Sequence, residues 1–402
     1  MKQGWEYKKL GEVCYPKNKI QRATKCFDTS DKIFYIDISS IDNTIQKMSD
    51  VISVTFGDAP SRAQQKVEYG DIIVSTVRPN LKNIAIIDRY ESNLVASSGF
   101  CVLRNTEHVE RNYLFHYITS DLFTQHLMKL TTGANYPAVR DQDVRDSIIP
   151  IPPKSTQLSI VSELDKINEL IRLKKEQLKD YDNLAQSIFY EMFGDPVENE
   201  KGWEVKHLGE LCDKISNGYN TKLEEDTYKT EGIMYFRCQN VWRNHFDYSD
   251  LVYIDEDTNQ KMKSSSLKHN DFLITKIGRI NTENSSLGRV SLYEGDDDKA
   301  NLSGNLCFAR LTKDIAVHKF ILYILISNQF RNYIRRTTVG GIDKRALNVK
   351  QISSFPIISP PLPLQHLFAQ RIEQIERQRS AVQKSITDLE TLLASRMQYW
   401  FE

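Results

Sequence analysis

The sequence predicts an α+β protein with two homologous domains, each mainly twisted β-structure with helices. Two long helices that form an antiparallel coiled coil join these domains. Three observations support this fold: a long motif occurs twice, each half places several short strands before a helix, and each half ends in a heptad pattern. Strands that precede the helix, rather than alternate with it, indicate α+β domains.

The duplication is clearest at the start of each half. The segment Gly4–Cys14 returns as Gly202–Cys212 with eight of eleven positions identical. Further matched positions follow in the same order: Asp71 with Asp271, then Pro152-Pro153 with Pro360-Pro361. A period of roughly 200 residues is far too long for a solenoid, so it predicts two domains with a core each.

The globular halves show the same order of elements. Short apolar runs bounded by Gly, Asp and Asn predict strands. In the first half these runs are Ile33–Ile38, Asp71–Val77, Ile84–Ile87 and Phe100–Leu103, followed by a helix over Tyr113–Leu130. In the second half they are Ile233–Cys238, Phe272–Ile277, Arg289–Tyr293 and Leu306–Leu311, followed by a helix over His318–Arg335.

A proline pair followed by apolar residues at steps of three and four ends each half. Such a 3.5-residue repeat over four to five heptads is typical of a coiled coil. We expect the two helices to pair antiparallel, although packing of each helix on its own domain is the alternative. Roughly 38 residues give a rod of about 57 Å that would space the domains. The expected pairing residues are Ile160, Leu164, Ile167, Ile171, Leu178, Ile188, Ile372, Ile375, Val382, Ile386, Leu389 and Leu393.

Composition narrows the class of protein. The chain has 402 residues, 40% of them hydrophobic and 26% charged, which is ordinary for a globular protein. Lys plus Arg equals Asp plus Glu at 53 each, which argues against coating nucleic acid by bulk charge but leaves sequence-specific binding open. The N-terminal residues lack the apolar core of a signal peptide, so we expect a cytoplasmic protein.

Two loop regions in each half carry side chains that read base edges or bind phosphates. One region follows the second predicted strand and the other follows the helix. For any single residue a solvated loop charge is the simpler interpretation, but equivalent placement in both halves favours nucleic-acid binding. The candidates are Arg78, Asn80, Lys82, Asn135, Tyr136 and Arg140 in the first half, and Lys276, Arg279, Asn281, Arg335, Arg336, Lys344 and Arg345 in the second.

Signatures of catalysis and cofactor binding are missing from the sequence. It contains no Asn-Pro-Pro-Tyr-type methyltransferase motif and no Gly-x-x-x-x-Gly-Lys-Ser/Thr loop. The six cysteines form no Cys-x-x-Cys pair, so we interpret them as small buried hydrophobes. Asp71 and Asp271 each begin an apolar strand after Gly or Asn, which turn chemistry explains better than a metal site. We therefore expect no metal, no cofactor and no catalytic residue.

The chain resembles the specificity (S) subunits of Type I restriction–modification enzymes over essentially its whole length. The resemblance rests on the Gly-Trp-Glu-x-Lys-x-Leu-Gly-Glu opening of both halves, the Gly70–Ser75 strand, the run from Thr132 to Pro153 and the helix end at Ser187–Pro196. It implies two target recognition domains that each read one half of a split, asymmetric site on double-stranded DNA. It also implies helices that set the spacer and dock two methyltransferase (modification) subunits, and restriction (ATP-dependent endonuclease) subunits that join this core.

On this resemblance the expected domains are target recognition domains at 1–153 and 197–360, and conserved helical regions at 154–196 and 361–402. The short junction Pro196–Lys201 is a departure that lets the second repeat begin soon after the first helix. The family has no short base-reading motif, so the candidate contacts above rest on side-chain chemistry and loop position. A two-domain adaptor that binds proteins without DNA selectivity, and a nuclease with one metal site per repeat, are the alternatives.

Overall fold

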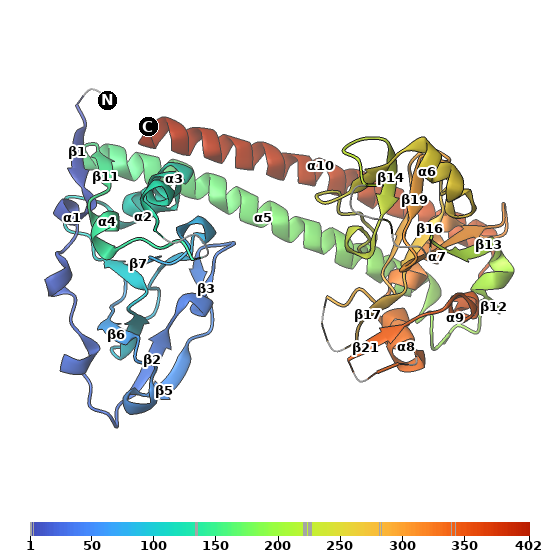
Figure 1. Cartoon of the computed structure of the whole chain (residues 1–402), viewed down its shortest axis with the longest axis horizontal. Coiled ribbons are helices and arrows are strands. Elements are labelled where there is room, and N and C mark those ends of the chain that lie inside the picture. The colour runs from blue at the N-terminus through green and yellow to red at the C-terminus, as the bar shows by residue number, and fades with distance from the viewer. Residues whose placement is uncertain are drawn as a thin grey trace. The chain divides into compact units, whose positions relative to one another are not determined.

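The computed structural model describes the chain except residues 1, 3, 133–135, 220–222, 224–226, 281, 283, 339 and 342. Two compact units make up the chain. Unit 1 comprises Met1–Lys175 with Gln383–Glu402, and unit 2 comprises Glu176–Val382. Helices α5 (Lys154–Phe193) and α10 (Leu362–Phe401), labelled in Figure 1, each contribute residues to both units. Unit 1 thus contains the beginning of α5 and the end of α10, and unit 2 contains the end of α5 and the beginning of α10.

Unit 1 is built on small sheets covered by short helices. A three-stranded sheet has the order β10-β7-β8 and a four-stranded sheet the order β5-β2-β9-β6, in which β2 and β9 are parallel. The helices are α1 (Leu10–Val13), α2 (Arg111–Thr119), α3 (Asp121–Leu130) and α4 (Asp141–Arg145). The strands are β1 (Glu6–Lys9), β2 (Lys32–Ile36), β3 (Ile41–Asp42), β4 (Lys47–Met48), β5 (Ile52–Thr55), β6 (Ala63–Lys66), β7 (Ile72–Ser75), β8 (Ile84–Ile86), β9 (Leu94–Ser97), β10 (Phe100–Leu103) and β11 (Ile148–Ile151).

Unit 2 repeats this plan with changes at its margins. Its sheets have the orders β13-β20-β16-β18 and β15-β14-β19, with β14 and β19 parallel, and β17 forms a two-stranded sheet with β21. The helices are α6 (Glu256–Lys261), α7 (His318–Ile326), α8 (Asn328–Thr337) and α9 (Val349–Ser353). The strands are β12 (Val205–His207), β13 (Cys212–Asn217), β14 (Ile233–Phe236), β15 (Val252–Ile254), β16 (Phe272–Thr275), β17 (Ile277–Arg279), β18 (Val290–Leu292), β19 (Ala300–Leu302), β20 (Leu306–Leu311), β21 (Lys344–Ala346) and β22 (Pro356–Ile358).

The predicted fold class is confirmed, but the single helix predicted in each half is wrong. Ser120 separates α2 from α3, and Ser327 separates α7 from α8. Each serine has extended backbone and accepts a hydrogen bond from the amide three residues later, which is N-cap geometry. The apolar spacing continued past both serines, so the sequence pattern concealed the break.

An aspartate–arginine pair recurs at the start of the central strand in both units. Asp71 is 1% exposed, and its carboxylate accepts hydrogen bonds from Nε and Nη2 of Arg104 at 2.7 and 2.8 Å. Asp271 is fully buried and binds Arg310 in the same way at 2.8 and 2.7 Å. These hydrogen bonds raise the pKa of both guanidinium groups. The aspartates therefore anchor strands β7 and β16.

A buried glutamine fixes the first turn of each long helix to its globular body. Gln157 Oε1 accepts from the amide of Glu110, and Gln157 Nε2 donates to the carbonyl of Pro152 at 3.0 Å. Gln365 repeats both contacts, on Val317 and Pro360. Because both glutamines are buried and bonded at each end of the amide, they fix the direction in which each helix leaves its body.

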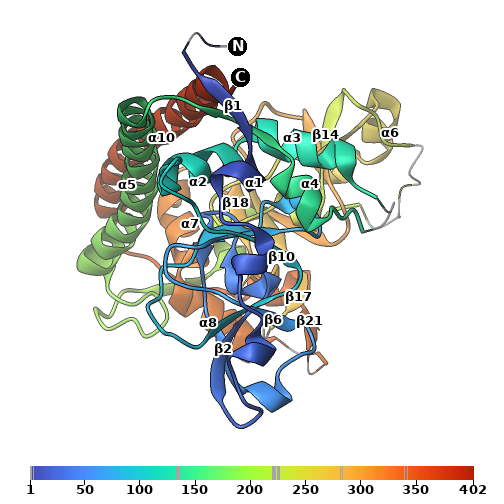
Figure 2. The same cartoon turned by 90° about the vertical axis from the view of Figure 1, so that its left-hand side faces the viewer.

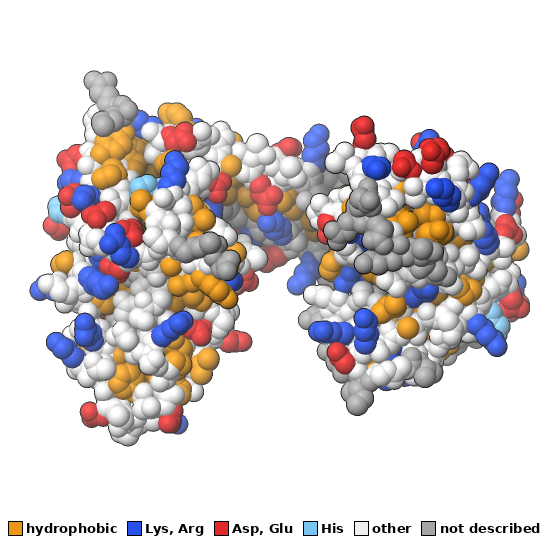
Figure 3. Space-filling view, in the orientation of Figure 1, with side chains coloured by type: hydrophobic (Ala, Val, Ile, Leu, Met, Phe, Trp, Pro, Cys, Tyr) orange, Lys and Arg blue, Asp and Glu red, His pale blue; other side chains and the backbone are white. Residues whose placement is uncertain are grey.

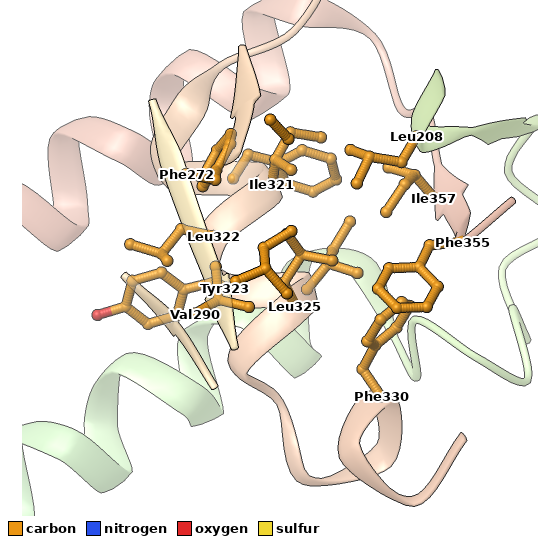
Figure 4. Close-up of a cluster of buried hydrophobic side chains, with 14 of the residues drawn as sticks. Leu208, Phe272, Val290, Ile321, Leu322, Tyr323, Leu325, Phe330, Phe355 and Ile357 are labelled. Carbon is orange, nitrogen blue, oxygen red and sulfur yellow. The ribbon is translucent and has the colours of Figure 1, made fainter. Parts of the chain in front are cut away.

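The end of each long helix is buried by aromatic side chains. In unit 1 Phe401 lies between Tyr113 and Tyr117, with ring centroids 5.5 and 5.6 Å away. In unit 2 Phe193 lies 4.8 Å from Phe320 and 5.5 Å from Phe368. Each helix thus starts in one unit and ends in the core of the other. The core of unit 2 around Phe272, Phe330 and Phe355 is drawn in Figure 4.

The two long helices run antiparallel within each unit, and both views show them side by side (Figures 1 and 2). In unit 1 the side chain of Glu163 pairs with Arg396, and Lys175 pairs with Glu390 at 2.8 Å. In unit 2 Asp182 pairs with Arg379 at 3.0 Å. Of the residues expected in the seam, Ile160, Leu164, Ile167, Ile171, Ile372, Ile375, Val382 and Ile386 are buried, whereas Leu178, Ile188, Leu389 and Leu393 are half-buried.

Among the residues that the structure describes, no helix combines the length and apolarity needed to cross a bilayer. The same part of the chain contains no cluster of three or more His, Cys, Asp or Glu side chains positioned to bind a metal ion.

Candidate nucleic-acid interface

In unit 1 the two candidate loops lie side by side. Val77 forms an antiparallel bridge with Ala138, the amide of Arg78 donates to Pro137 at 2.7 Å, and that of Val139 donates to Thr76 at 2.9 Å. The segment after β7 therefore pairs with the segment before α4. This pairing brings Arg78 and Tyr136 onto one surface.

Arg78 and Tyr136 form the exposed part of that surface. The guanidinium carbon of Arg78 lies 4.7 Å from the ring centroid of Tyr136, whose side chain is 68% exposed. Arg78 has φ of 50° and caps the short helix Pro79–Leu81, in which Asn80 is also exposed. The contact between Arg78 and Tyr136 has the geometry of a cation–π interaction.

The other candidates of unit 1 are engaged or outside the described residues. Lys82 Nζ binds Asp121 at 2.6 Å and the carbonyl of Thr119 at 3.0 Å, so this lysine joins the loop to the start of α3. Arg140 is paired with Asp143 at 2.8 Å but keeps 84% of its side chain exposed. Asn135 lies outside the residues that the structure describes.

In unit 2 the equivalent segments extend into a β-ribbon. Strand β17 pairs antiparallel with β21, and Arg279 stands opposite Lys344 in the register. Both side chains are exposed, and Arg279 contacts Asp343 at 3.4 Å. The sequence predicted loops here, and this prediction is wrong because residues more than 60 apart along the chain pair with each other, a contact without a local signature.

Two other candidate cations of unit 2 bind groups of the protein itself, next to this ribbon. Lys276 Nζ donates to Asn217 at 2.7 Å, and burial lowers the pKa of its ammonium group. Arg345 donates to the carbonyls of Arg335 and Thr338, at 2.7 and 3.0 Å, and thus binds the end of α8.

Two further arginines lie at the end of α8, where the helix meets the ribbon. Arg335 itself donates to the carbonyl of Thr282 at 3.3 Å. Arg336 is exposed, and Asn281 lies outside the residues that the structure describes. Of the two, Arg336 is therefore the one free to meet a ligand.

A groove of 910 Å³ beside the ribbon was not predicted from the sequence. Its wall contains Trp242, over whose ring the buried guanidinium of Arg289 lies at 3.8 Å. Arg289 also donates to the carbonyl of Ser285 at 3.1 Å, which ties the turn after the ribbon to the Trp242 loop. Exposed amides of Gln239 and Asn305 face the same groove. Nothing local in the sequence links residues so far apart.

Three of the six cysteines are buried, whereas Cys238 is half-buried and lines the groove. Cys14, Cys101 and Cys307 are buried, and burial raises the pKa of the Cys14 and Cys307 thiols to about 12. A thiol that holds its proton so firmly is a poor nucleophile and a poor metal ligand. Charged side chains of both signs are interspersed over the face drawn in Figure 3, in keeping with the zero net charge.

Comparisons with known proteins agree with this duplicated architecture. The Type I restriction modification DNA specificity domain matches residues 2–180 and again residues 200–391. The Type I restriction enzyme MjaIX specificity subunit of Methanocaldococcus jannaschii is 23% identical over 80% of this chain and 74% of its own. The EcoKI specificity subunit of Escherichia coli is 22% identical over 81% of this chain and 72% of its own.

A solved structure extends the likeness to three dimensions. A chain from a study of complex assembly and conformational transition of the type I R-M system is 28% identical to this one. It covers 100% of this chain and 98% of its own, with a TM-score of 0.63. The two matches to one domain, in the two halves that the sequence repeats, lead to one conclusion: the chain belongs to the family of Type I restriction–modification DNA specificity subunits.

Proposed function

We propose that the two globular bodies act as two target recognition domains, at 1–153 and 197–360, and that each reads one half of a bipartite, asymmetric site on double-stranded DNA. The helical regions at 154–196 and 361–402 set the untouched spacer between the two halves. One observation carries this proposal: the strand that follows the Asp–Arg pair continues, in both units, into a paired segment with exposed cations. The major groove admits a two-stranded β-ribbon of this kind.

The proposed contacts differ in their expected roles. Arg78, Tyr136 and Asn80 in unit 1, and Arg279, Lys344 and Arg336 in unit 2, are exposed and form the proposed contact surface. Arg140 is placed at the margin of this surface. Asn135 and Asn281 stay in the proposal on their sequence positions alone. Lys82, Lys276, Arg335 and Arg345 are proposed to support the loops that carry the contacts.

The helices are proposed to act as the spacer because α5 and α10 are unbroken over 40 residues each. Inserting four residues after Gln177 and four after Ser385 should lengthen the preferred spacer between the half-sites. If a complex with both insertions still methylates sites that have the original spacer length, the proposed role of the helices is contradicted.

The exposed faces of the two helices are proposed to dock two methyltransferase subunits. Exposed leucine side chains stabilise a protein interface when a partner protein buries them. Leu184 of α5 and Leu392 of α10 hold equivalent positions in the repeat, and each is 45% exposed. One lies in each unit, which suits one methyltransferase per unit. Further exposed leucines lie on the same helices in each unit: Leu158, Leu170 and Leu173 in unit 1, and Leu362 and Leu367 in unit 2.

The chain itself is proposed to recognise DNA without catalysing a reaction and without a cofactor. Its methyltransferase partners would modify the site, and ATP-dependent restriction subunits would join the same core. This assignment places the chain in the cytoplasm, where the DNA is.

The test is methylome sequencing of a host that expresses the chain with its neighbouring methyltransferase. We expect methylation at a bipartite motif with a fixed gap, lost when this chain is deleted. Methylation that is unchanged by the deletion would favour the adaptor function instead. Nicking of DNA by the isolated chain with a divalent metal would favour the nuclease.

A further inference from the structure

We propose that Arg78 reads a guanine in the half-site bound by unit 1, and that Tyr136 holds the Arg78 guanidinium in place for this contact. The inference rests on the proposed function of unit 1 as a DNA reader. It adds the base that is read, the side chain that reads it and the reason that only one half-site uses this contact.

The backbone of Arg78 is held in a costly conformation. Its φ of 50° and ψ of 61° lie in the left-handed region, which residues other than Gly, Asn and Asp seldom adopt. Its amide donates to Pro137 at 2.7 Å, and its carbonyl accepts from Leu81 at 2.9 Å. Strained residues held by their surroundings occur most often where a side chain must be aimed for function.

The side chain of Arg78 lies over the Tyr136 ring and has no polar partner in the part of the chain that the structure describes. It stacks on Tyr136 at 4.7 Å, yet it has no hydrogen bond or ion pair with the described residues. Three other arginines of unit 1 bind a carboxylate instead: Arg104 binds Asp71, Arg89 binds Glu91 and Arg140 binds Asp143. Arg111, like Arg78, lies over a ring, that of Tyr69, at 5.6 Å. An exposed guanidinium that is ordered by a ring, rather than by a carboxylate, keeps its donors available for a ligand.

The donors of Arg78 match the major-groove edge of guanine. The two parallel N–H groups of a guanidinium bind O6 and N7 of guanine together, which is the commonest specific contact in the major groove. Stacking on Tyr136 restricts the plane of the fork in advance and so reduces the ordering cost on binding. A phosphate can also accept two parallel N–H groups, so the experiment must distinguish a base contact from a phosphate contact.

Only the first half-site should use this contact. Counting from the matched pair Asp71 and Asp271, the residue of unit 2 equivalent to Arg78 is Gly278. A Cβ atom at Gly278 would collide with the amide nitrogen of Leu287, so unit 2 excludes any side chain at this position. Unit 2 therefore cannot make the Arg78 contact from the equivalent position.

The experiment uses the assembled methyltransferase complex carrying Arg78→Gly and, as a control, the complex carrying Arg89→Ala, which removes an arginine of unit 1 that is paired with Glu91. Glycine accepts the left-handed backbone, so Arg78→Gly removes the side chain and relieves the strain. In methylome sequencing, we expect Arg78→Gly to accept other bases at one guanine of one half of the motif, with the other half and the gap unchanged. Arg89→Ala should leave the motif as it is, because Arg89 is paired with Glu91 and lies outside the proposed contact surface. An unchanged motif in Arg78→Gly overturns the proposal.

Binding to modified duplexes distinguishes a base contact from a phosphate contact. Replacing that guanine by 7-deazaguanine removes N7, and we expect it to weaken binding of the unmodified complex by roughly 5- to 150-fold. It should not weaken binding of the Arg78→Gly complex any further. If Arg78→Gly weakens all duplexes equally and stays sensitive to 7-deazaguanine, Arg78 contacts a phosphate and the proposal is wrong.

Two substitutions test the positioning role of Tyr136. Tyr136→Phe keeps the ring and should keep discrimination at this guanine, whereas Tyr136→Leu should lose part of it at an unchanged Tm. Equal discrimination in both variants would overturn the positioning role. A wild-type complex that gives no bipartite motif would refute the proposed function itself, which is a separate result from the failure of Arg78→Gly.

Discussion

Units 1 and 2 agree in the side chains that hold the fold and differ in the side chains that face the proposed ligand. The Asp–Arg pair, the glutamine of the first helical turn and the terminal phenylalanine recur with the same contacts. The paired segment is one bridge in unit 1 and a ribbon in unit 2. The two units have thus kept individual hydrogen bonds that hold the fold, whereas the residues proposed to contact DNA differ between them.

The largest effect should come from removing the terminal phenylalanines. Phe193→Ala leaves a cavity in unit 2 and Phe401→Ala leaves one in unit 1, and each should lower the free energy of unfolding by about 3–5 kcal/mol. Hydrogen exchange should report faster exchange in the unit that receives the helix end. Faster exchange only in the unit where the helix begins would contradict the assignment of each helix end to the opposite repeat.

A smaller effect should follow from neutralising the buried aspartates. Asp71→Asn and Asp271→Asn keep the shape but leave Arg104 or Arg310 without its charged partner, at a cost of about 3 kcal/mol. The matched pair should be destabilised to a similar extent, because both carboxylates make the same contacts. Denaturant unfolding of the two variants measures this. If one variant loses much of its free energy of unfolding and the other loses none, the two Asp–Arg pairs do not contribute equally to stability.

The smallest effect should come from the partly exposed pair of Glu163 and Arg396. Hydrogen bonding to Arg396 lowers the pKa of Glu163, so the pair stabilises the fold above the unfolded pKa near 4.5 and loses this as pH falls. Glu163→Gln should cost about 0.5–1 kcal/mol at neutral pH and nothing once the wild-type carboxyl is protonated. Unfolding curves measured at neutral pH, and at a pH low enough to protonate the Glu163 carboxyl, test this. A cost that persists at low pH would indicate lost packing instead.

The elements with a long, regular period were predictable from the sequence. The heptads and proline pairs predicted both long helices because such a pattern reports burial over many turns. The repeat also located β7 and β16, since an apolar strand that starts after a turn is a local signal. The break at Ser120 could have been found from the same sequence, because Ser followed by Asp is a helix start.

The candidate site was less predictable because its geometry depends on distant pairing. Lys276 and Arg345 have the chemistry of DNA contacts, yet their partners, Asn217 and the end of α8, turn them towards the protein. The stack of Arg289 on Trp242 joins residues 47 apart. Arg104 and Arg310 did carry a signal, since each directly follows one of the matched segments Phe100–Leu103 and Leu306–Ala309.

The burial of Phe401 in unit 1 has a consequence for synthesis. Domains generally fold from the N-terminus as the ribosome makes them. Unit 1, however, takes Gln383–Glu402 into its core, and these residues are translated only after the whole of unit 2. The body that is made first is therefore completed last, and until then it exposes the apolar surface that Phe401 will cover.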